Sequence, residues 1–197
     1  LAVEVNCGEC WYCRHHYNNT TCENQVMAYG IHPNADTAPY LRGGFAEYMY
    51  IMPGTSLFKV LEDLPTDVAV FVEEFAVAYH SLARATQPFA AVNEGFGPGG
   101  SVAVLGNGPL GLLHGIMASI HGAGLCIATD LADFRLAKAK ELYADVAINA
   151  STTSPAERIA QARELTEGVG PDLVIESAGE PEVFLEALEM VRKGGTV

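Results

Sequence analysis

The sequence predicts an α/β protein in which a doubly wound parallel sheet follows a smaller lobe held together by a metal ion. Three observations support this prediction. Four cysteines lie close together near the start, strand-like and helix-like stretches alternate after residue 100, and a glycine-rich motif joins the first of those strands to its helix. Such an alternation builds a parallel sheet with helices on both faces.

The elements of the second half follow from changes in hydrophobic periodicity. Short apolar and β-branched runs predict buried strands, whereas apolar residues three or four positions apart predict helices. The predicted strands are 101–105, 125–129, 146–148 and 173–175, with a further strand beginning at 196–197. The predicted helices between them are 110–121, 133–143, 155–166 and 182–191.

The first half has weaker periodicity. Residues 45–51 and 57–60 combine aromatic and β-branched side chains, and these predict two short strands. Pro65 in a first helical turn predicts a helix through Val72, and 76–85 predict another. The prolines and glycines of 87–100 predict a loop.

Composition excludes several classes of protein. The chain has 197 residues, of which 49% are hydrophobic and 18% charged, so it can bury a core and is not expected to be disordered. A net charge of −13 argues against binding nucleic acid or an anionic membrane. No run of eighteen apolar residues occurs, so we expect no transmembrane helix and no signal peptide.

The run CGECWYCRHHYNNTTC carries Cys7, Cys10, Cys13 and Cys22. Four thiolates suit Zn²⁺, and a closed four-ligand site is structural because no coordination position remains for a substrate. Disulfides or free thiols are the alternative. Of the five cysteines, a disulfide pairing would leave Cys126 alone, in an apolar run that predicts a core position. Close C-x-x-C spacing therefore favours metal in a reducing, cytoplasmic compartment.

The glycine-rich motif has the pattern G-x-G-x-x-G between a predicted strand and a predicted helix, the context in which it binds a dinucleotide. Its first glycine allows the tight turn, its second lets the backbone approach a pyrophosphate, and its third lets the helix pack on the strand. The helix N-terminus then offers free N–H groups to the phosphates. The motif consists of Gly106, Asn107, Gly108, Pro109, Leu110 and Gly111.

Asp130 ends the next predicted strand, about twenty residues beyond the glycine loop, where a carboxylate would bind the adenosine ribose. A 2′-phosphate would be repelled there, so we expect NAD(H) rather than NADP(H). The alternative is that Asp130 caps the following helix, a role that Asp133 could also fill. Arg135 could cover the adenosine or be a solvated charge on the helix surface.

With both motifs, the chain resembles the zinc-dependent medium-chain alcohol dehydrogenases, nearer to the sorbitol and threonine dehydrogenase branch. The resembling segments follow the family's order. They are CGECWYC at 7–13 with Cys22, GGFAEYM at 43–49, EEFAVAYHS at 73–81, VLGNGPLGLL at 104–113, DLADFRLAKAKELYADVAIN at 130–149 and DLVIESAGEPEVFLEALEMVRKGG at 172–195.

The resemblance implies a zinc lobe and part of a GroES-like β domain at residues 1–75. A Rossmann NAD-binding domain would follow at 76–197, with an incomplete sheet. It implies that the four cysteines hold structural zinc and that Ser177 and Ala178 lie near the coenzyme. We accordingly expect the chain to be a fragment of a longer protein.

Glu73 falls where the resemblance implies an acidic residue at a catalytic zinc, so we expect it to be both catalytic and a metal ligand. Glu74 replaces a proline common there, which leaves open which of the two carboxylates faces the metal. A helix-start carboxylate is the alternative for Glu73. The family also takes a Cys and a His from before the lobe. Nothing precedes Leu1, so we expect this fragment to be inactive.

The activity that the resemblance implies is hydride transfer between an alcohol or polyol and NAD(H), in a homodimer or homotetramer that acts on a small-molecule alcohol or carbonyl. Two alternatives belong to other classes. One is a non-catalytic NAD-binding protein that retains only structural zinc. The other is a zincless reductase of the same superfamily. We expect neither nucleic acid nor a membrane as partner.

Overall fold

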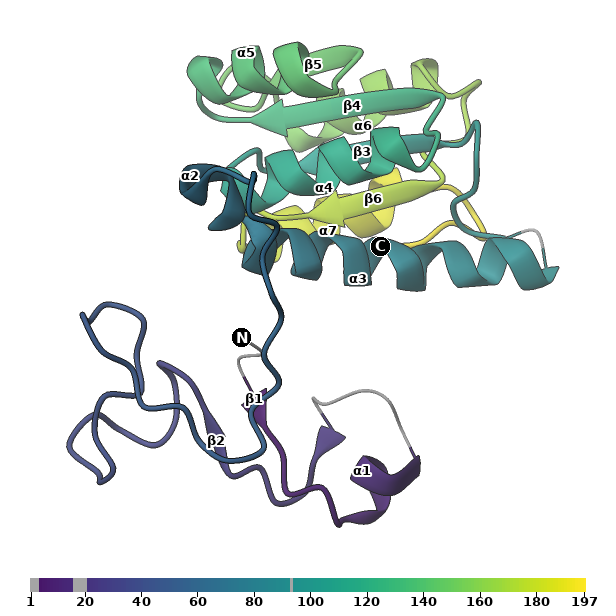
Figure 1. Ribbon diagram of the computed structural model, residues 1–197. Helices are drawn as coiled ribbons and strands as arrows, with labels where there is room; N and C mark the ends of the chain where they lie inside the picture. Colours follow the sequence, from purple (N-terminus) through teal and green to yellow (C-terminus); the bar gives the residue numbers. More distant parts are fainter. Residues whose placement is uncertain (1–3, 16–20, 93) are drawn as a thin grey trace. The chain divides into compact units, whose positions relative to one another are not determined.

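The computed structural model describes residues 4–15, 21–92 and 94–197 (Figure 1). The chain divides into two compact units, Leu1–Leu64 and Pro65–Val197. The division expected between residues 75 and 76 lies inside the continuous helix α3 (Val72–Val92). Because Ala78 and Leu82 of this helix are buried against the strands of the second unit, α3 belongs with that unit along its length.

The first unit contains little regular structure. Strand β1 (Glu4–Val5) pairs antiparallel with β2 (Met27–Ala28), and α1 (Trp11–His15) lies between them in sequence. Its apolar cluster is small: Val5, Met27 and Tyr29 are buried, with Met49 and Met52 packed against them. A core of this size needs a further cross-link to hold a fixed structure.

The strands predicted at 45–51 and 57–60 are absent, which corrects the prediction. A strand needs a hydrogen-bonded neighbour. Tyr50 donates to the carbonyl of Leu41 at 2.7 Å, but no ladder follows in the described part of this unit. Phe45 and Phe58 are instead among the most exposed apolar side chains. The aromatic and β-branched pattern therefore has no sheet to join here.

The second unit contains a four-stranded parallel sheet in the order β5-β4-β3-β6 (Figure 1). The strands are β3 (Ser101–Leu105), β4 (Leu125–Asp130), β5 (Val146–Asn149) and β6 (Leu173–Glu176). Thr196 adds a parallel bridge to Leu173 beyond β6. The predicted doubly wound parallel sheet is confirmed. Because β4 and β6 flank β3 on opposite sides, the connections diverge at β3, and ligands bind at such a point.

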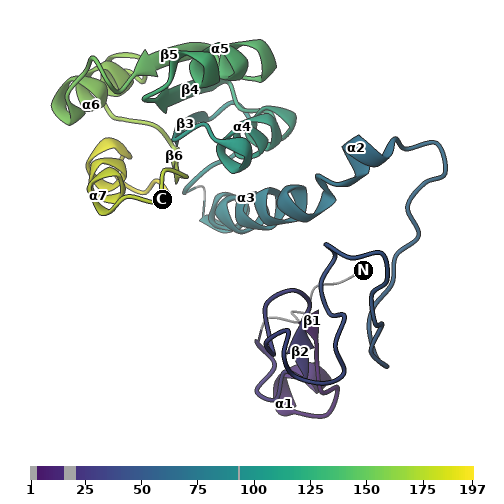
Figure 2. The same cartoon turned by 90° about the vertical axis from the view of Figure 1, so that its left-hand side faces the viewer.

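Helices cover both faces of the sheet, as Figures 1 and 2 show. In β3, Val102 and Val104 join the cluster that contains α3 and α4, whereas Ala103 and Leu105 join the cluster with α6 and α7. Burial on both faces explains why the strands are almost continuously apolar. The helices are α4 (Pro109–Ile120), α5 (Asp133–Leu142), α6 (Pro155–Glu164) and α7 (Pro181–Met190).

Before the sheet, two helical predictions need correction. The helix predicted through Val72 is only the short α2 (Thr66–Ala69), and α3 begins at Val72 itself. The loop predicted at 87–100 begins later, because α3 continues to Val92. The single proline within α3 removes only one N–H donor from the helix, so the helix can continue past it. The glycines of this segment, from Gly95 onward, all lie after the end of the helix.

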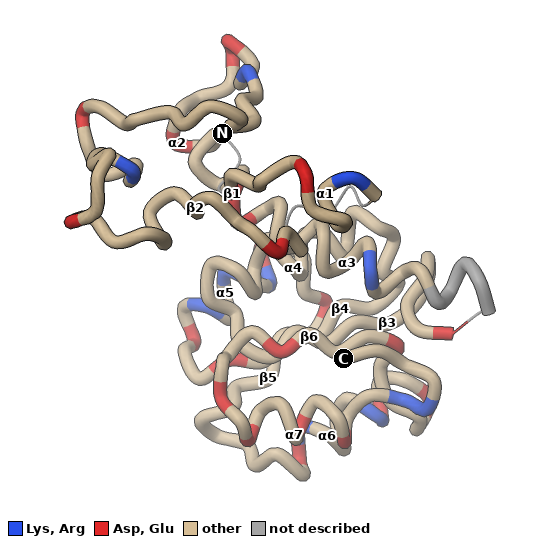
Figure 3. Tube along the Cα trace, turned by 90° about the horizontal axis from the view of Figure 1, so that it is seen from below, with Lys and Arg blue, Asp and Glu red and all other residues tan. Residues whose placement is uncertain are grey.

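The structure agrees with the acidic composition and with the absence of a long apolar run. Acidic residues are spread along both units and basic residues are few (Figure 3). Among the described residues, no helix combines the length and apolar character that a membrane span requires.

Candidate functional site

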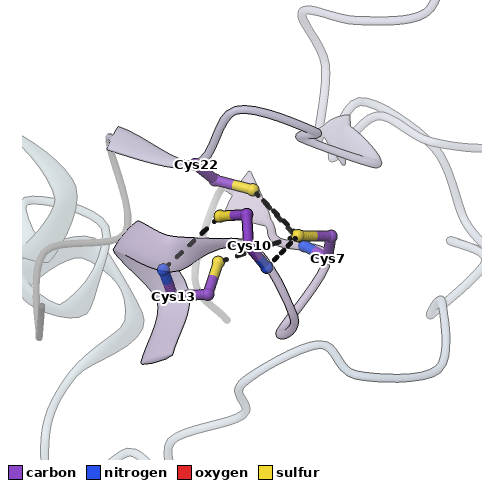
Figure 4. A group of neighbouring side chains, drawn as sticks. All are labelled: Cys7, Cys10, Cys13 and Cys22. Atoms are coloured by element: carbon purple, nitrogen blue, oxygen red, sulfur yellow. Dashed lines mark hydrogen bonds between the residues drawn. The ribbon is translucent and has the colours of Figure 1, made fainter. Parts of the chain in front are cut away.

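Four cysteine sulfurs converge in the first unit, where they point toward one another (Figure 4). The Sγ atoms of Cys7, Cys10, Cys13 and Cys22 all lie within 4.8 Å of one another. Cys7 Sγ is 3.6 Å from Cys22 Sγ and 3.9 Å from Cys13 Sγ. Sulfurs about 2.3 Å from a tetrahedral Zn²⁺ lie about 3.8 Å apart. The donor set and its spacing therefore fit Zn²⁺, and zinc ligation stays a prediction.

Backbone N–H groups position these sulfurs. Cys7 follows β1, and the amides of Cys10 and Cys13 donate to the sulfurs of Cys7 and Cys10, respectively, each at 3.4 Å. The amide of Cys7 donates to Cys22 Sγ at 3.5 Å. Gly8, with φ +74°, allows the sharp turn between the first two cysteines. N–H donors of this kind favour the thiolate form that binds metal.

The pKa values of the cysteines diverge within the cluster. The backbone N–H groups of Glu9 and Cys10 hold the pKa of Cys7 below its usual range. The N–H of Cys13 is the main cause that lowers the pKa of Cys10 to about 6, whereas hydrogen bonding to Cys10 raises the pKa of Cys13 to about 12. Without a cation, the thiols of Cys7, Cys10 and Cys13 thus do not ionise together.

All five cysteines carry free thiols. The 3.6 Å between the sulfurs of Cys7 and Cys22 is far longer than the ~2.05 Å of a disulfide bond. Cys126 is buried in β4, as its apolar neighbours predict. The disulfide alternative therefore has no support in this structure.

A second site lies at the carboxyl ends of the parallel strands. A cavity of about 440 Å³ opens there, lined by residues that directly follow β3, β4, β5 and β6. This is where a doubly wound sheet binds its ligand. Six of the residues predicted to bind the coenzyme line this cavity: Gly106, Gly108, Asp130, Arg135, Ser177 and Ala178.

The three glycines of the loop differ in what surrounds them. Gly106 has φ +90°, and a Cβ there would lie 2.7 Å from the backbone nitrogen of Ala178. A Cβ on Gly111 would lie 2.0 Å from the carbonyl oxygen of Gly106. A Cβ on Gly108 would meet nothing within 4 Å. The protein's own packing thus requires the first and third glycines, whereas the space beside the second is free for a ligand.

The N-terminus of α4 faces this space without a cap of its own. Gly108 is the N-cap residue and Pro109 begins the helix, so no side chain accepts the first N–H groups. No acidic residue lies in the first turn. The amides of Leu110 and Gly111 and the helix dipole are therefore suited to an anionic group such as a pyrophosphate.

Asp130 is buried, and its carboxylate ties the glycine loop to the end of β4. Its Oδ2 accepts the amide of Asn107 at 2.7 Å, and its Oδ1 accepts the amide of Ala132 at 2.9 Å. Ala132, not Asp130, is the N-cap of α5, so the alternative capping role does not apply. Each carboxylate oxygen has two lone pairs, which leaves one on each for a ribose hydroxyl.

Arg135 lies beside this carboxylate. Its Nη1 is 3.7 Å from Asp130 Oδ2, and 46% of its side chain is exposed. Arg135 is therefore held at the cavity by an ion pair, although it stays accessible to solvent. Ser177 also lines the cavity, and its Oγ is buried and has no hydrogen-bond partner among the described residues. An orphaned hydroxyl beside this cavity fits a polar ligand group.

Glu73 and Glu74 lie in the first turn of α3, where Glu73 is exposed and Glu74 half-buried. Within the described ranges, the four cysteines form the only group of three or more potential metal ligands. Glu73 thus belongs to no group of three potential ligands among the described residues, and its role at a catalytic metal stays a prediction.

Sequence reasoning missed several residues that shape the cavity. Tyr143 reaches the glycine loop, and its ring occupies space left by Gly115. Arg158 and Glu186 form a buried ion pair that also lines the cavity. Gly115 in α4 is the one local sequence signal for the contact that Tyr143 makes. The ion pair joins two helices and has no signature in either helix alone.

Residues 109–197 match the family of zinc-binding dehydrogenases. The chain carries this match within its second unit. It is 32% identical to sorbitol dehydrogenase of Bacillus subtilis and 33% identical to L-threonine 3-dehydrogenase of Bacillus velezensis, over 99% and 96% of its residues. It covers 50% and 48% of those proteins, so the chain spans about half the length of the curated relatives that it matches.

The chain has the same fold as about half of each of two solved dehydrogenases. The alcohol dehydrogenase of Thermotoga maritima is 31% identical, with a TM-score of 0.85 over 98% of this chain and 51% of the other. A zinc-binding dehydrogenase of Sinorhizobium meliloti, solved with NADP bound, is 30% identical, with a TM-score of 0.79 over 98% of this chain and 51% of that one. The resemblance drawn from the motifs is thereby confirmed.

Proposed function

We propose that the protein to which this chain belongs is a zinc-dependent alcohol dehydrogenase, which transfers a hydride between an alcohol or polyol and NAD(H). The observation that carries the proposal is that one chain holds two kinds of site. A four-sulfur cluster with zinc spacing occurs in one unit, and a cavity lined by the glycine loop and Asp130 lies at the sheet edge of the other. Relatives named as sorbitol and threonine dehydrogenases support the alcohol or polyol substrate class.

In this proposal the cysteine cluster is structural, because its four sulfurs leave no coordination position for substrate. The amides of the α4 N-terminus hold the pyrophosphate, and Gly108 lets it approach the backbone. The orphaned hydroxyl of Ser177 and the backbone at Ala178, which lies against Gly106, complete the lining of the cavity.

The coenzyme we propose is NAD(H). The buried carboxylate of Asp130 would accept the ribose hydroxyls and repel a 2′-phosphate. Two observations weigh against a strong preference. Arg135 lies 3.7 Å from that carboxylate and offsets part of its charge. The Sinorhizobium meliloti neighbour was solved with NADP bound. The proposed preference for NAD(H) therefore depends on Asp130 keeping its place at the loop through its hydrogen bond to the amide of Asn107.

A catalytic zinc, when bound, would polarise the substrate oxygen and lower the pKa of the alcohol. Glu73 is our candidate among the described residues for contact with that metal, with Glu74 as the alternative. We further propose a homodimer or homotetramer in the cytoplasm. The competing functions are a non-catalytic NAD-binding protein with structural zinc alone and a zincless reductase.

The deciding experiment is elemental analysis of zinc in the full-length protein, followed by a screen for NAD⁺ reduction with alcohols and polyols. About two zinc ions per chain and NADH formation are expected for filled structural and catalytic sites. About one zinc without NADH formation would favour the non-catalytic protein. Reductase activity without zinc would favour the zincless reductase. The Glu73→Gln and Glu74→Gln variants then show which carboxylate the activity needs.

A further inference from the structure

The phenol of Tyr143 contacts the glycine loop but does not line the cavity. Tyr143 follows the last residue of α5, and its hydroxyl contacts Oδ1 of Asn107 at 2.5 Å. Asn107 is the second residue of the loop and is fully buried. The contact therefore joins the end of one helix to the backbone that would carry the pyrophosphate.

The chemistry of Asn107 fixes the direction of this hydrogen bond. Its Nδ2 lies 3.0 Å from the carbonyl oxygen of Thr129 and 3.3 Å from that of Val104. Carbonyl oxygens can only accept, so the amide nitrogen must face them and the amide oxygen must face Tyr143. Burial raises the pKa of the Tyr143 phenol, which keeps its proton available for donation.

Asn107 transmits this constraint to the ribose side of the cavity. Its backbone N–H donates to Oδ2 of Asp130 at 2.7 Å. The orientation of that peptide depends on Gly106, whose φ of +90° is closed to other residues. A rotation of the Asn107 side chain would therefore shift both the loop amides and the carboxylate of Asp130.

Room for the phenol comes from a glycine in α4. A Cβ on Gly115 would lie 2.2–2.4 Å from the ring atoms of Tyr143, so the ring fills the space that a side chain would take. Gly115 is buried and does not line the cavity. Its contact with the ring suggests that the helix is shaped to admit this tyrosine.

From these contacts we infer that Tyr143 is a positioning residue for dinucleotide binding. It acts through Asn107 and holds the glycine loop and Asp130 in the arrangement that the coenzyme meets. The inference rests on the proposed coenzyme site. Tyr143 itself touches no ligand, since it does not line the cavity.

The test replaces Tyr143 by phenylalanine in the full chain, which removes the hydroxyl and keeps the ring. Kd values for NADH and for ADP-ribose are measured by titration well below the melting temperature. Loss of the hydrogen bond leaves Asn107 Oδ1 without its donor, so both Kd values should rise by the same factor, on the order of tenfold. An equal effect on ADP-ribose places the defect on the loop and ribose side.

The matched control is Tyr29→Phe in the first unit. The Tyr29 hydroxyl bonds to Thr55 at 2.7 Å and accepts the amide of Met52 at 2.8 Å. Its loss should lower the melting temperature without changing either Kd. A general loss of stability would instead weaken binding in both variants and overturn the inference.

The outcomes separate the two proposals. If the unmodified protein does not bind NADH, the proposed function fails and the inference with it. If it binds NADH and Tyr143→Phe binds it equally well, the inference alone is overturned. Should Tyr143→Phe not fold, Asn107→Ser removes the same hydrogen bond from the other side together with the two bonds of Asn107 Nδ2, and a rise in both Kd values at least as large is expected.

Discussion

Arg158 of α6 and Glu186 of α7 form a bidentate ion pair that lines the cavity at the carboxyl ends of the parallel strands. Arg158 Nε is 2.7 Å from Glu186 Oε1, and its Nη2 is 2.6 Å from Oε2. The side chains are only 9% and 3% exposed. The remaining nitrogen of Arg158 donates to the carbonyl of Thr153 at 2.5 Å. The pair thus fastens two helices to each other on one face of the sheet.

Replacing Glu186 with leucine should destabilise the second unit strongly. The guanidinium of Arg158 would stay buried without its counter-charge, which costs about 3–5 kcal/mol. Urea denaturation of Glu186→Leu measures the free energy of unfolding. The double variant Arg158→Met with Glu186→Leu should recover most of the loss, because an apolar pair of similar volume is often neutral. A double variant as unstable as the single one would contradict this account.

The surface pair Lys138–Glu141 provides the control for this experiment. Its side chains are 50% and 64% exposed at a separation of 2.6 Å. Solvent screens such a pair, so Glu141→Gln should change the unfolding free energy by no more than about 1 kcal/mol. A similar cost for both substitutions would show that burial is not what makes the Arg158 pair matter.

Gly108→Ala should separate ligand binding from folding. The glycine has φ −65°, and a methyl group at its Cβ position would meet nothing within 4 Å, so alanine fits the folded protein. We expect an unchanged or slightly raised melting temperature and a loss of NADH affinity of about tenfold or more, because the methyl occupies the space for the pyrophosphate. Equilibrium titration measures the NADH affinity, and thermal denaturation of the same sample measures the melting temperature.

Gly106→Ala is the matched variant for that prediction. Its Cβ would lie 2.7 Å from a backbone nitrogen, at a φ of +90°. Folding and binding should therefore fail together. If Gly108→Ala bound NADH as tightly as the unmodified protein, the second glycine would have no role toward a ligand.

The α/β unit could be predicted from sequence because its signals are local. Buried parallel strands are short apolar runs, and β3 matches its predicted bounds, 101–105. The glycine loop is recognised by the G-x-G-x-x-G pattern in its position between a predicted strand and a predicted helix. The cysteine spacing likewise predicts which sulfurs come together, since nearby thiols have few other arrangements available.

The rest depends on contacts between distant segments. The apolar pattern of 45–51 is that of a strand, but a pattern cannot say whether a neighbouring strand is present. The bond between Tyr143 and Asn107 needs Gly115 from a third element, so no single window of sequence contains it. The residues of the loop can be identified from the sequence alone, whereas the contacts that hold the loop in place depend on how distant segments pack together.

Gly115→Ala tests that packing through stability. The added methyl would lie 2.2–2.4 Å from the Tyr143 ring, and the ring has to move. Overpacking of this kind costs about 1–3 kcal/mol. In the Tyr143→Ala background the same methyl meets no ring, so Gly115→Ala should cost less there or even stabilise the helix. Additive costs in the double-variant cycle would show that the two residues do not interact.

Removal of zinc should unfold the first unit and spare the second. The apolar cluster of Val5, Met27 and Tyr29 is small, so we expect zinc bound by the four cysteines to supply the cross-link. Trp11, the single tryptophan, lies between Cys10 and Cys13 and stacks on His15 with ring centroids 4.8 Å apart. A chelator should therefore change tryptophan fluorescence and expose residues 1–64 to protease. The helical circular dichroism of the second unit should persist.

The fifth cysteine supplies the control for the zinc experiment. Cys13→Ser removes one predicted ligand and should lower the zinc content by about one ion per chain and reproduce the effect of the chelator. Cys126→Ala changes a buried thiol in β4, in the other unit, and should leave zinc content and the Trp11 signal unchanged. A lobe that kept its fluorescence and protease resistance without zinc would show that its few apolar contacts suffice, and the structural role of the metal would be refuted.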